Sequence, residues 1–231
     1  MTQVFLLHGL GADRRAFQRF ERLLPDTWQV ESLDLLGHGE APKPATGYAL
    51  ADHATYVLEQ VAQRDAPDPV LVGHSYGAAT SVAAAALQPE RVRGIVLLDP
   101  VVRISDDVVG GNTARMVRAR REGTLQETVA AIYPDASEAL RAWTVQTWEA
   151  MALGVVDELD GDWTRYADRV TCPTAIIHGD EELGGAGDLA ADWFDDPEVV
   201  RIAGSGHYLH ATHARETAAA VVAAVAGFTA T

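Results

Sequence analysis

Residues 70–83 have the sequence VLVGHSYGAATSVA, the most informative segment of the chain. An apolar run leads into a turn in which Gly73 and Gly77 flank Ser75, and small residues typical of a buried helix follow. The pattern G-x-S-x-G indicates a nucleophile only in such a strand–turn–helix context. There the turn holds the serine in a strained backbone conformation above the sheet, and glycines avoid collisions across the bend. We therefore interpret Ser75 as a candidate nucleophile.

Short apolar runs alternate with helical patterns along most of the chain. The runs are rich in Val, Ile and Leu with little polar alternation, which is typical of parallel strands buried on both faces. Expected strands lie at residues 2–7, 29–33, 70–72, 94–98, 174–177 and 199–202. Expected helices lie near residues 13–24, 51–65, 76–88, 186–194 and 213–227. This order predicts one α/β domain, residues 1–231, with a mostly parallel, doubly wound sheet of about six strands.

Residues 101 to about 170 interrupt this alternation with several helical segments and no convincing strand. Long insertions between strands are usually functional, and this one would lie over the carboxyl ends of the strands, where ligands bind. We expect a helical cap there. The alternative, that its aromatic side chains only fix the insertion to the core, stays open for Tyr133, Trp143, Trp148 and Trp163.

Four blocks resemble the α/β-hydrolase superfamily, in the expected order and over essentially the whole chain. They are the loop 8–11 (HGLG), the loop 34–39 (DLLGHG), the turn around Ser75 and the segment 204–207 (GSGH). The chain begins at what resembles the family's third strand, so the resemblance implies an all-parallel sheet. Leu36 stands where family members often carry Arg, which leaves open how the loop 34–39 is held. We expect that loop to brace the site rather than to react.

A serine hydroxyl needs a base to take its proton, and His207 follows the last apolar run, which fits the chain order Ser, acid, His. The alternative is a structural histidine. The acid fixes the tautomer of the base. The resemblance places it three residues after Gly179, at Glu182, with Asp180 as the second candidate. Asp99, directly after an apolar run, is the third.

The oxyanion hole is expected to consist of backbone amides. The resemblance assigns them to Leu10, in the loop 8–11, and to Tyr76, at the start of a helix whose N-terminus favours developing negative charge. The alternative for the loop 8–11 is a simple tight turn. His210 and His213 lie three residues apart but lack H-E-x-x-H or a cysteine set, so we expect no metal. No cofactor is implied.

These residues favour hydrolysis of a small carboxylic ester or lactone through an acyl-enzyme intermediate. One alternative is a non-hydrolytic enzyme of the same fold, a lyase or perhydrolase. A lysine-assisted lyase would need Lys43, the single lysine of the chain, to reach the site. Another alternative is a ligand-binding receptor with slow turnover.

Composition limits the partners. The chain has 18 Lys and Arg against 33 Asp and Glu, a net charge of −15, which makes a nucleic-acid partner improbable because phosphate binding requires basic clusters. The sequence shows no secretory signal and no apolar stretch long enough to cross a bilayer. A single cysteine excludes an intramolecular disulfide and suits a reducing compartment. We expect a cytoplasmic protein with a small-molecule substrate and no membrane partner; the sequence does not determine the oligomeric state.

Overall fold

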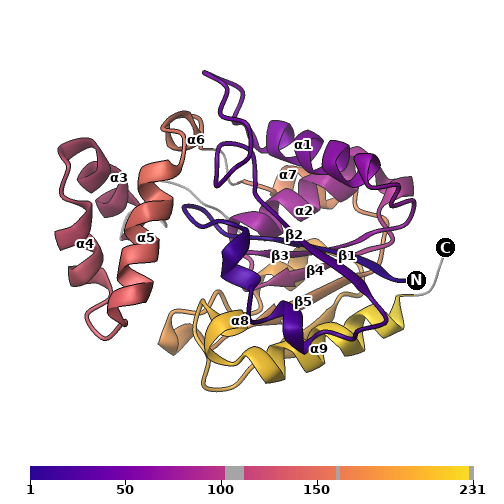
Figure 1. Ribbon diagram of the computed structural model, residues 1–231. Helices are drawn as coiled ribbons and strands as arrows, with labels where there is room; N and C mark the ends of the chain where they lie inside the picture. The colour runs from indigo at the N-terminus through magenta and orange to yellow at the C-terminus, as the bar shows by residue number, and fades with distance from the viewer. Residues whose placement is uncertain (102–111, 160–161, 229–231) are drawn as a thin grey trace.

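The computed structural model describes residues 1–101, 112–159 and 162–228. Six strands form one sheet in the order β2-β1-β3-β4-β5-β6, and every neighbouring pair is parallel (Figure 1). The strands are β1 (Gln3–Leu7), β2 (Gln29–Leu33), β3 (Val70–His74), β4 (Gly94–Leu98), β5 (Thr174–His178) and β6 (Glu198–Arg201). The prediction of an all-parallel sheet of about six strands is therefore confirmed.

The inner strands of the sheet are buried on both faces, as their composition predicted. Every residue of β3, β4 and β5 is buried, whereas the edge strand β2 is partly exposed and the edge strand β6 is largely exposed. Because all strands run in one direction, the loops after β1, β3, β4, β5 and β6 meet at the same edge of the sheet. The candidate site residues follow these strands.

Helices cover both faces of the sheet (Figure 1). One face carries α1 (Leu50–Gln63), α2 (Tyr76–Leu87) and α7 (Thr164–Ala167), and the other carries α8 (Leu209–Thr212) and α9 (Ala214–Gly227). Helix α2 is buried from Tyr76 to Ala86, because its small side chains let it pack between α1 and the sheet. None of the helices in the described ranges is long and apolar enough to cross a bilayer.

Four helices between β4 and β5 form a body of their own beside the carboxyl ends of the strands (Figure 1, left). These inserted helices are α3 (Asn112–Glu122), α4 (Leu125–Ile132), α5 (Glu138–Ala150) and α6 (Gly154–Asp157). They enclose a cluster that includes Met116, Val129 and Trp148 and reaches Leu36 of the main domain. Of the expected cap, residues 102–111 and 160–161 lie outside the described ranges.

Trp163 belongs to the main domain rather than to the inserted helices. Its ring is fully buried, stacks on Phe194, and donates from Nε1 to the carbonyl of Val101 at 2.8 Å. This aromatic residue thus fixes the end of the insertion to the core.

Two expected helices are short 3₁₀ segments instead. Residues 13–24 contain Arg14–Phe17 and Glu21–Leu23, and residues 186–194 contain Leu189–Trp193. A 3₁₀ helix aligns residues three apart, and Phe17 and Phe20 are both fully buried with ring centroids 5.9 Å apart.

Candidate active site

Ser75 occupies the sharp turn between β3 and α2. Its backbone has φ 53° and ψ −113°, a region that a residue with a side chain rarely adopts. The turn is held by the Ser75 amide, which donates to the carbonyl of Leu98 at 3.1 Å, and by the Ser75 carbonyl, which accepts from Ala78 and Ala79. The strained conformation expected from the sequence is therefore present and is enforced by its surroundings.

The glycines that flank Ser75 have no space for a side chain. A Cβ atom on Gly73 would lie 2.2 Å from the carbonyl oxygen of Gly77, and one on Gly77 would lie 2.1 Å from that of Leu7. Both contacts are with backbone, which cannot move aside cheaply. The turn is thus packed against itself and against the end of β1.

His207 lies in the loop after β6 and contacts Asp99. The Nδ1 atom of His207 is 2.6 Å from Oδ2 of Asp99. Asp99 directly follows β4 and is completely buried. The carboxylate also accepts from the amides of Gly179, at 2.9 Å, and of Ala186, at 2.9 and 3.0 Å. These amides fix the carboxylate in place, so the ring is oriented by a rigid partner.

The other two candidate carboxylates, Asp180 and Glu182, form no hydrogen bond with His207 in the part of the chain that the structure describes. Asp180 bonds to Nε of Arg201 at 2.6 Å and to the amide of Gly204 at 2.9 Å, and both bonds lower the pKa of Asp180. Glu182 is exposed and forms no hydrogen bond within the described ranges. Family spacing favoured Glu182, but the carboxylate on His207 is the one after β4.

His74 joins the turn to the loop of His207. Its Nε2 donates to the carbonyl of His207 at 2.8 Å, and the two ring centroids are 4.7 Å apart. Burial, together with the neighbouring His210 and His207, lowers the pKa of His74 well below its usual value. Sequence reasoning missed this residue, because the second position of G-x-S-x-G tolerates many side chains.

No hydrogen bond joins the Ser75 hydroxyl to the His207 ring in the described chain. The hydroxyl is half-buried, and His74, its neighbour in sequence, contacts the ring. Contacts between nucleophile and base are often loose and tighten only once substrate is bound. Ser75 and His207 are therefore linked in this structure through His74, which adjoins Ser75 in sequence and contacts His207.

The two amides expected in the oxyanion hole adjoin Ser75. A Cβ on Gly9 would lie 3.4 Å from Cβ of Ser75, so the loop 8–11 passes directly beside the serine. The amide of Leu10 has no acceptor among the described residues. Tyr76 directly follows Ser75 and is the first residue of α2.

The other two histidines of this region, His210 and His213, lie in α8 and directly after it. His210 lies in α8 and packs on the rings of His74 and Phe17, while His213 precedes α9. Within the described ranges, no three His, Cys, Asp or Glu side chains are grouped as a metal site requires.

Comparison with known proteins identifies the family of the chain. A sequence profile of the alpha/beta hydrolase family matches residues 4–220. The 2-(acetamidomethylene)succinate hydrolase of Mesorhizobium japonicum is 28% identical, over 90% of this chain and 82% of its own length. The pimeloyl-acyl-carrier protein methyl ester esterase of Neisseria meningitidis is 38% identical over 46% of this chain and 40% of its own length.

A solved structure shares the fold over nearly the whole chain. The esterase of Exiguobacterium antarcticum superposes with a TM-score of 0.82 at 18% identity, covering 98% of this chain and 92% of that one. The family profile covers most of the chain, and the parallel sheet and the strained serine turn after β3 are consistent with it. The protein therefore belongs to the alpha/beta hydrolase family.

Proposed function

We propose that this protein is a serine hydrolase that cleaves a small carboxylic ester or lactone through an acyl-enzyme intermediate. The observation that carries the proposal is the 2.6 Å contact between Nδ1 of His207 and the buried carboxylate of Asp99. A carboxylate at Nδ1 keeps the proton on that nitrogen, so Nε2 is left as a base for Ser75. Nucleophile, base and acid are then Ser75, His207 and Asp99.

The reaction proceeds in two steps. The Ser75 oxygen attacks the carbonyl carbon while its proton passes to Nε2 of His207, and the amides of Leu10 and Tyr76 stabilise the oxyanion. Collapse breaks the bond to the alcohol, which leaves with that proton. A water molecule then gives a proton to His207 and attacks the acyl carbon; the bond to the Ser75 oxygen breaks, and His207 returns the proton to that oxygen as the acid is released.

The inserted helices supply an apolar wall next to the oxyanion loop. Trp148 of α5 lies so close to Gly11 that a Cβ there would be 2.3 Å from its ring, and Leu10 packs against the same cluster. Tyr133, after α4, is 3.1 Å from the hydroxyl of Tyr208 beside the base. We assign these helices the role of a cap that favours a compact, partly apolar substrate.

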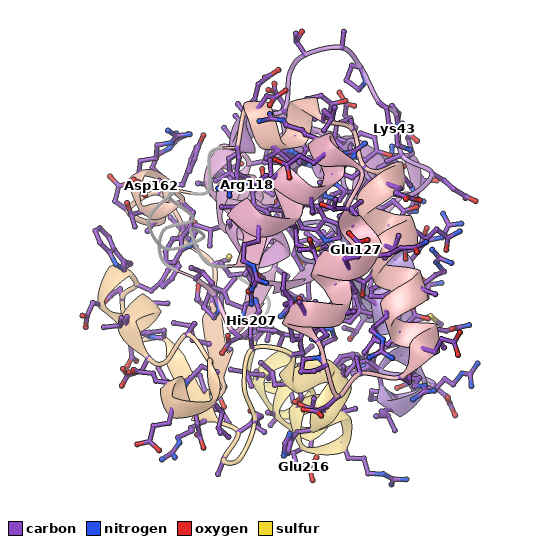
Figure 2. All side chains as sticks on the ribbon, turned by 90° about the vertical axis from the view of Figure 1, so that its left-hand side faces the viewer. Lys43, Arg118, Glu127, Asp162, His207 and Glu216 are labelled. Atoms are coloured by element: carbon purple, nitrogen blue, oxygen red, sulfur yellow. The ribbon has the colours of Figure 1, made fainter. Side chains whose placement is uncertain are left out.

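The relatives support the class of reaction. Their names describe a hydrolase and a methyl ester esterase. A lysine-assisted lyase has no support, because the exposed Lys43 donates to the carbonyl of Gly39 and lies far from His207 (Figure 2). Turnover distinguishes an enzyme from the ligand-binding receptor, because a receptor would release at most about one product molecule per protein molecule.

The test combines labelling with turnover. A fluorophosphonate probe should form one adduct on Ser75 and none on Ser75→Ala, with the site located by peptide mapping. A panel of p-nitrophenyl esters graded by acyl length, together with simple lactones, should show many turnovers per molecule, fastest for short chains. An adduct elsewhere, unchanged labelling of Ser75→Ala, or a single turnover on every substrate would refute the proposal.

A further inference from the structure

The loop that carries Leu10 is bound to the loop 34–39 by His38. The Nε2 atom of His38 accepts the amide hydrogen of Gly11 at 3.2 Å. Its Nδ1 atom donates to the carbonyl of Leu36 at 3.1 Å, within its own loop. The residue that follows Leu10 is thus held by a side chain from the loop after the neighbouring strand β2.

A second histidine makes the reciprocal contact. The Nε2 atom of His8, at the end of β1, accepts the amide hydrogen of Leu35 at 3.0 Å. Its Nδ1 atom donates to the carbonyl of Gly9 at 2.8 Å. The residue that precedes Leu10 is therefore held as well, and each loop presents one imidazole to the other.

Both rings must be neutral to make these contacts. Each Nε2 accepts a backbone N–H, which an imidazolium cannot do. Both rings are completely buried, and their centroids are 5.0 Å apart. Burial lowers the pKa of His38 well below the usual value, with a further contribution from His8, and burial also lowers the pKa of His8. The neutral tautomers are thus the ones that this environment favours.

We propose that His8 and His38 are positioning residues that hold the Leu10 amide in the oxyanion hole. The inference rests on the function proposed above. Two of the four residues in the loop 8–11 are glycines, and Gly11 has φ +70°, so the backbone has little stiffness of its own. The two imidazoles supply the missing constraint on either side of the amide.

The loop 34–39 is also held by hydrogen bonds that do not involve these rings. Asp34 accepts from the amide and guanidinium of Arg14, three residues after the loop 8–11, and Gly37 accepts from the amide of Ala152, between α5 and α6, at 2.8 Å. The loops should therefore stay together when one histidine contact is removed. Removal should shift the Leu10 amide rather than unfold the domain.

The experiment compares His38→Leu with His38→Gln on the best ester of the panel. Leucine removes the acceptor for Gly11, whereas the glutamine oxygen reaches about as far as Nε2 and restores one. We expect His38→Leu to lower kcat about 100-fold, the cost of a displacement near 1 Å at the reacting centre, with KM within about threefold. His38→Gln should recover at least about tenfold of that loss. His8→Gln should behave like His38→Gln.

The affinity for a transition-state analogue provides a second measurement, which would not change if the two histidines had only a structural role. A trifluoromethyl ketone adds to Ser75 and places its oxyanion in the hole, so its affinity should fall in proportion to kcat/KM across the variants. The matched control is His53→Leu, which also removes a fully buried imidazole but no hydrogen bond to either loop. Active sites are counted with the fluorophosphonate probe before rates are compared.

The outcomes are distinct. Wild-type kcat in folded His38→Leu, a loss confined to KM, or an equal loss in His53→Leu would each overturn the inference. If His38→Leu does not fold, His38→Gln and His8→Gln decide, and a loss above about 100-fold in both despite full labelling would count against it. Failure of the proposed function shows instead in the wild type, as absent turnover or absent labelling of Ser75.

Discussion

Replacing Asp99 with asparagine removes the charge of the proposed acid while nearly preserving its shape. The carboxylate accepts from three donors, namely Nδ1 of His207 and the amides of Gly179 and Ala186. Asparagine keeps one oxygen and gains an NH₂ group, which must face one of these donors. Facing His207, it forces Nδ1 to accept and moves the ring proton to Nε2, the atom that must take the proton of Ser75.

The expected loss in kcat is about 10⁴-fold, as for a triad whose base is held in the wrong tautomer, which corresponds to about 5 kcal/mol of transition-state stabilisation. Turning the NH₂ group toward Gly179 instead leaves two buried donors facing each other, at a cost of about 1–3 kcal/mol in folding stability. The assay is kcat on an activated ester for Asp99→Asn, Asp180→Asn and Glu182→Gln, each checked by thermal unfolding. The last two should stay within about threefold of the wild type.

One result would refute the assignment. If folded Asp99→Asn kept kcat within about tenfold of the wild type, the 2.6 Å contact with His207 would be structural. A loss of 10³-fold or more in Glu182→Gln or Asp180→Asn would then name the acid. Because Asp180 is held by Arg201 and the Gly204 amide, its replacement should alter stability rather than rate.

Lowering the pH from 7 to 5 should lower the free energy of unfolding by about 4 kcal/mol through His53 and His210 alone. Burial lowers their pKa values to about 4 and about 3, so below about pH 6.5 the unfolded chain binds protons that the folded chain does not; equal urea midpoints at the two pH values would contradict this. Gly11→Ala should destabilise more than Gly123→Ala by about 1–3 kcal/mol, because both have positive φ but only the former meets Trp148. Equal melting temperatures of the two variants would show that the Trp148 ring moves aside for the added methyl group at no cost in stability.

The sheet was predictable from the sequence because its inner strands are buried on both faces. Such strands must be apolar at nearly every position, so β3, β4 and β5 stand out without any knowledge of their neighbours. The serine turn was predictable for a related reason. The contacts that exclude a side chain at Gly73 and Gly77 are with nearby backbone, and they leave a local mark in the sequence.

The proposed acid, Asp99, could not be chosen from local sequence. Asp99 and Asp180 each come soon after a buried strand, and the sequence alone places both at the same edge of the sheet. What separates them is long-range. Arg201, on the far edge strand, draws Asp180 outward, while the backbone of Asp99 at φ 47° and the amide of Ala186 turn that carboxylate toward His207. Spacing borrowed from a family does not record these contacts.

The buried histidines show why one imidazole alone can carry the proton. The ring of His74 lies between His207 and His210, with centroids 4.7 and 4.3 Å away. Burial lowers the pKa values of His74 and His210, and a positive charge on His207 lowers both further. Of the three rings, only His207 has a carboxylate at hydrogen-bond distance, the buried Asp99. Under the proposed mechanism, a proton taken from Ser75 stays on the ring that faces Asp99, because transfer to His74 or His210 would place a charge in a buried site without a counter-ion.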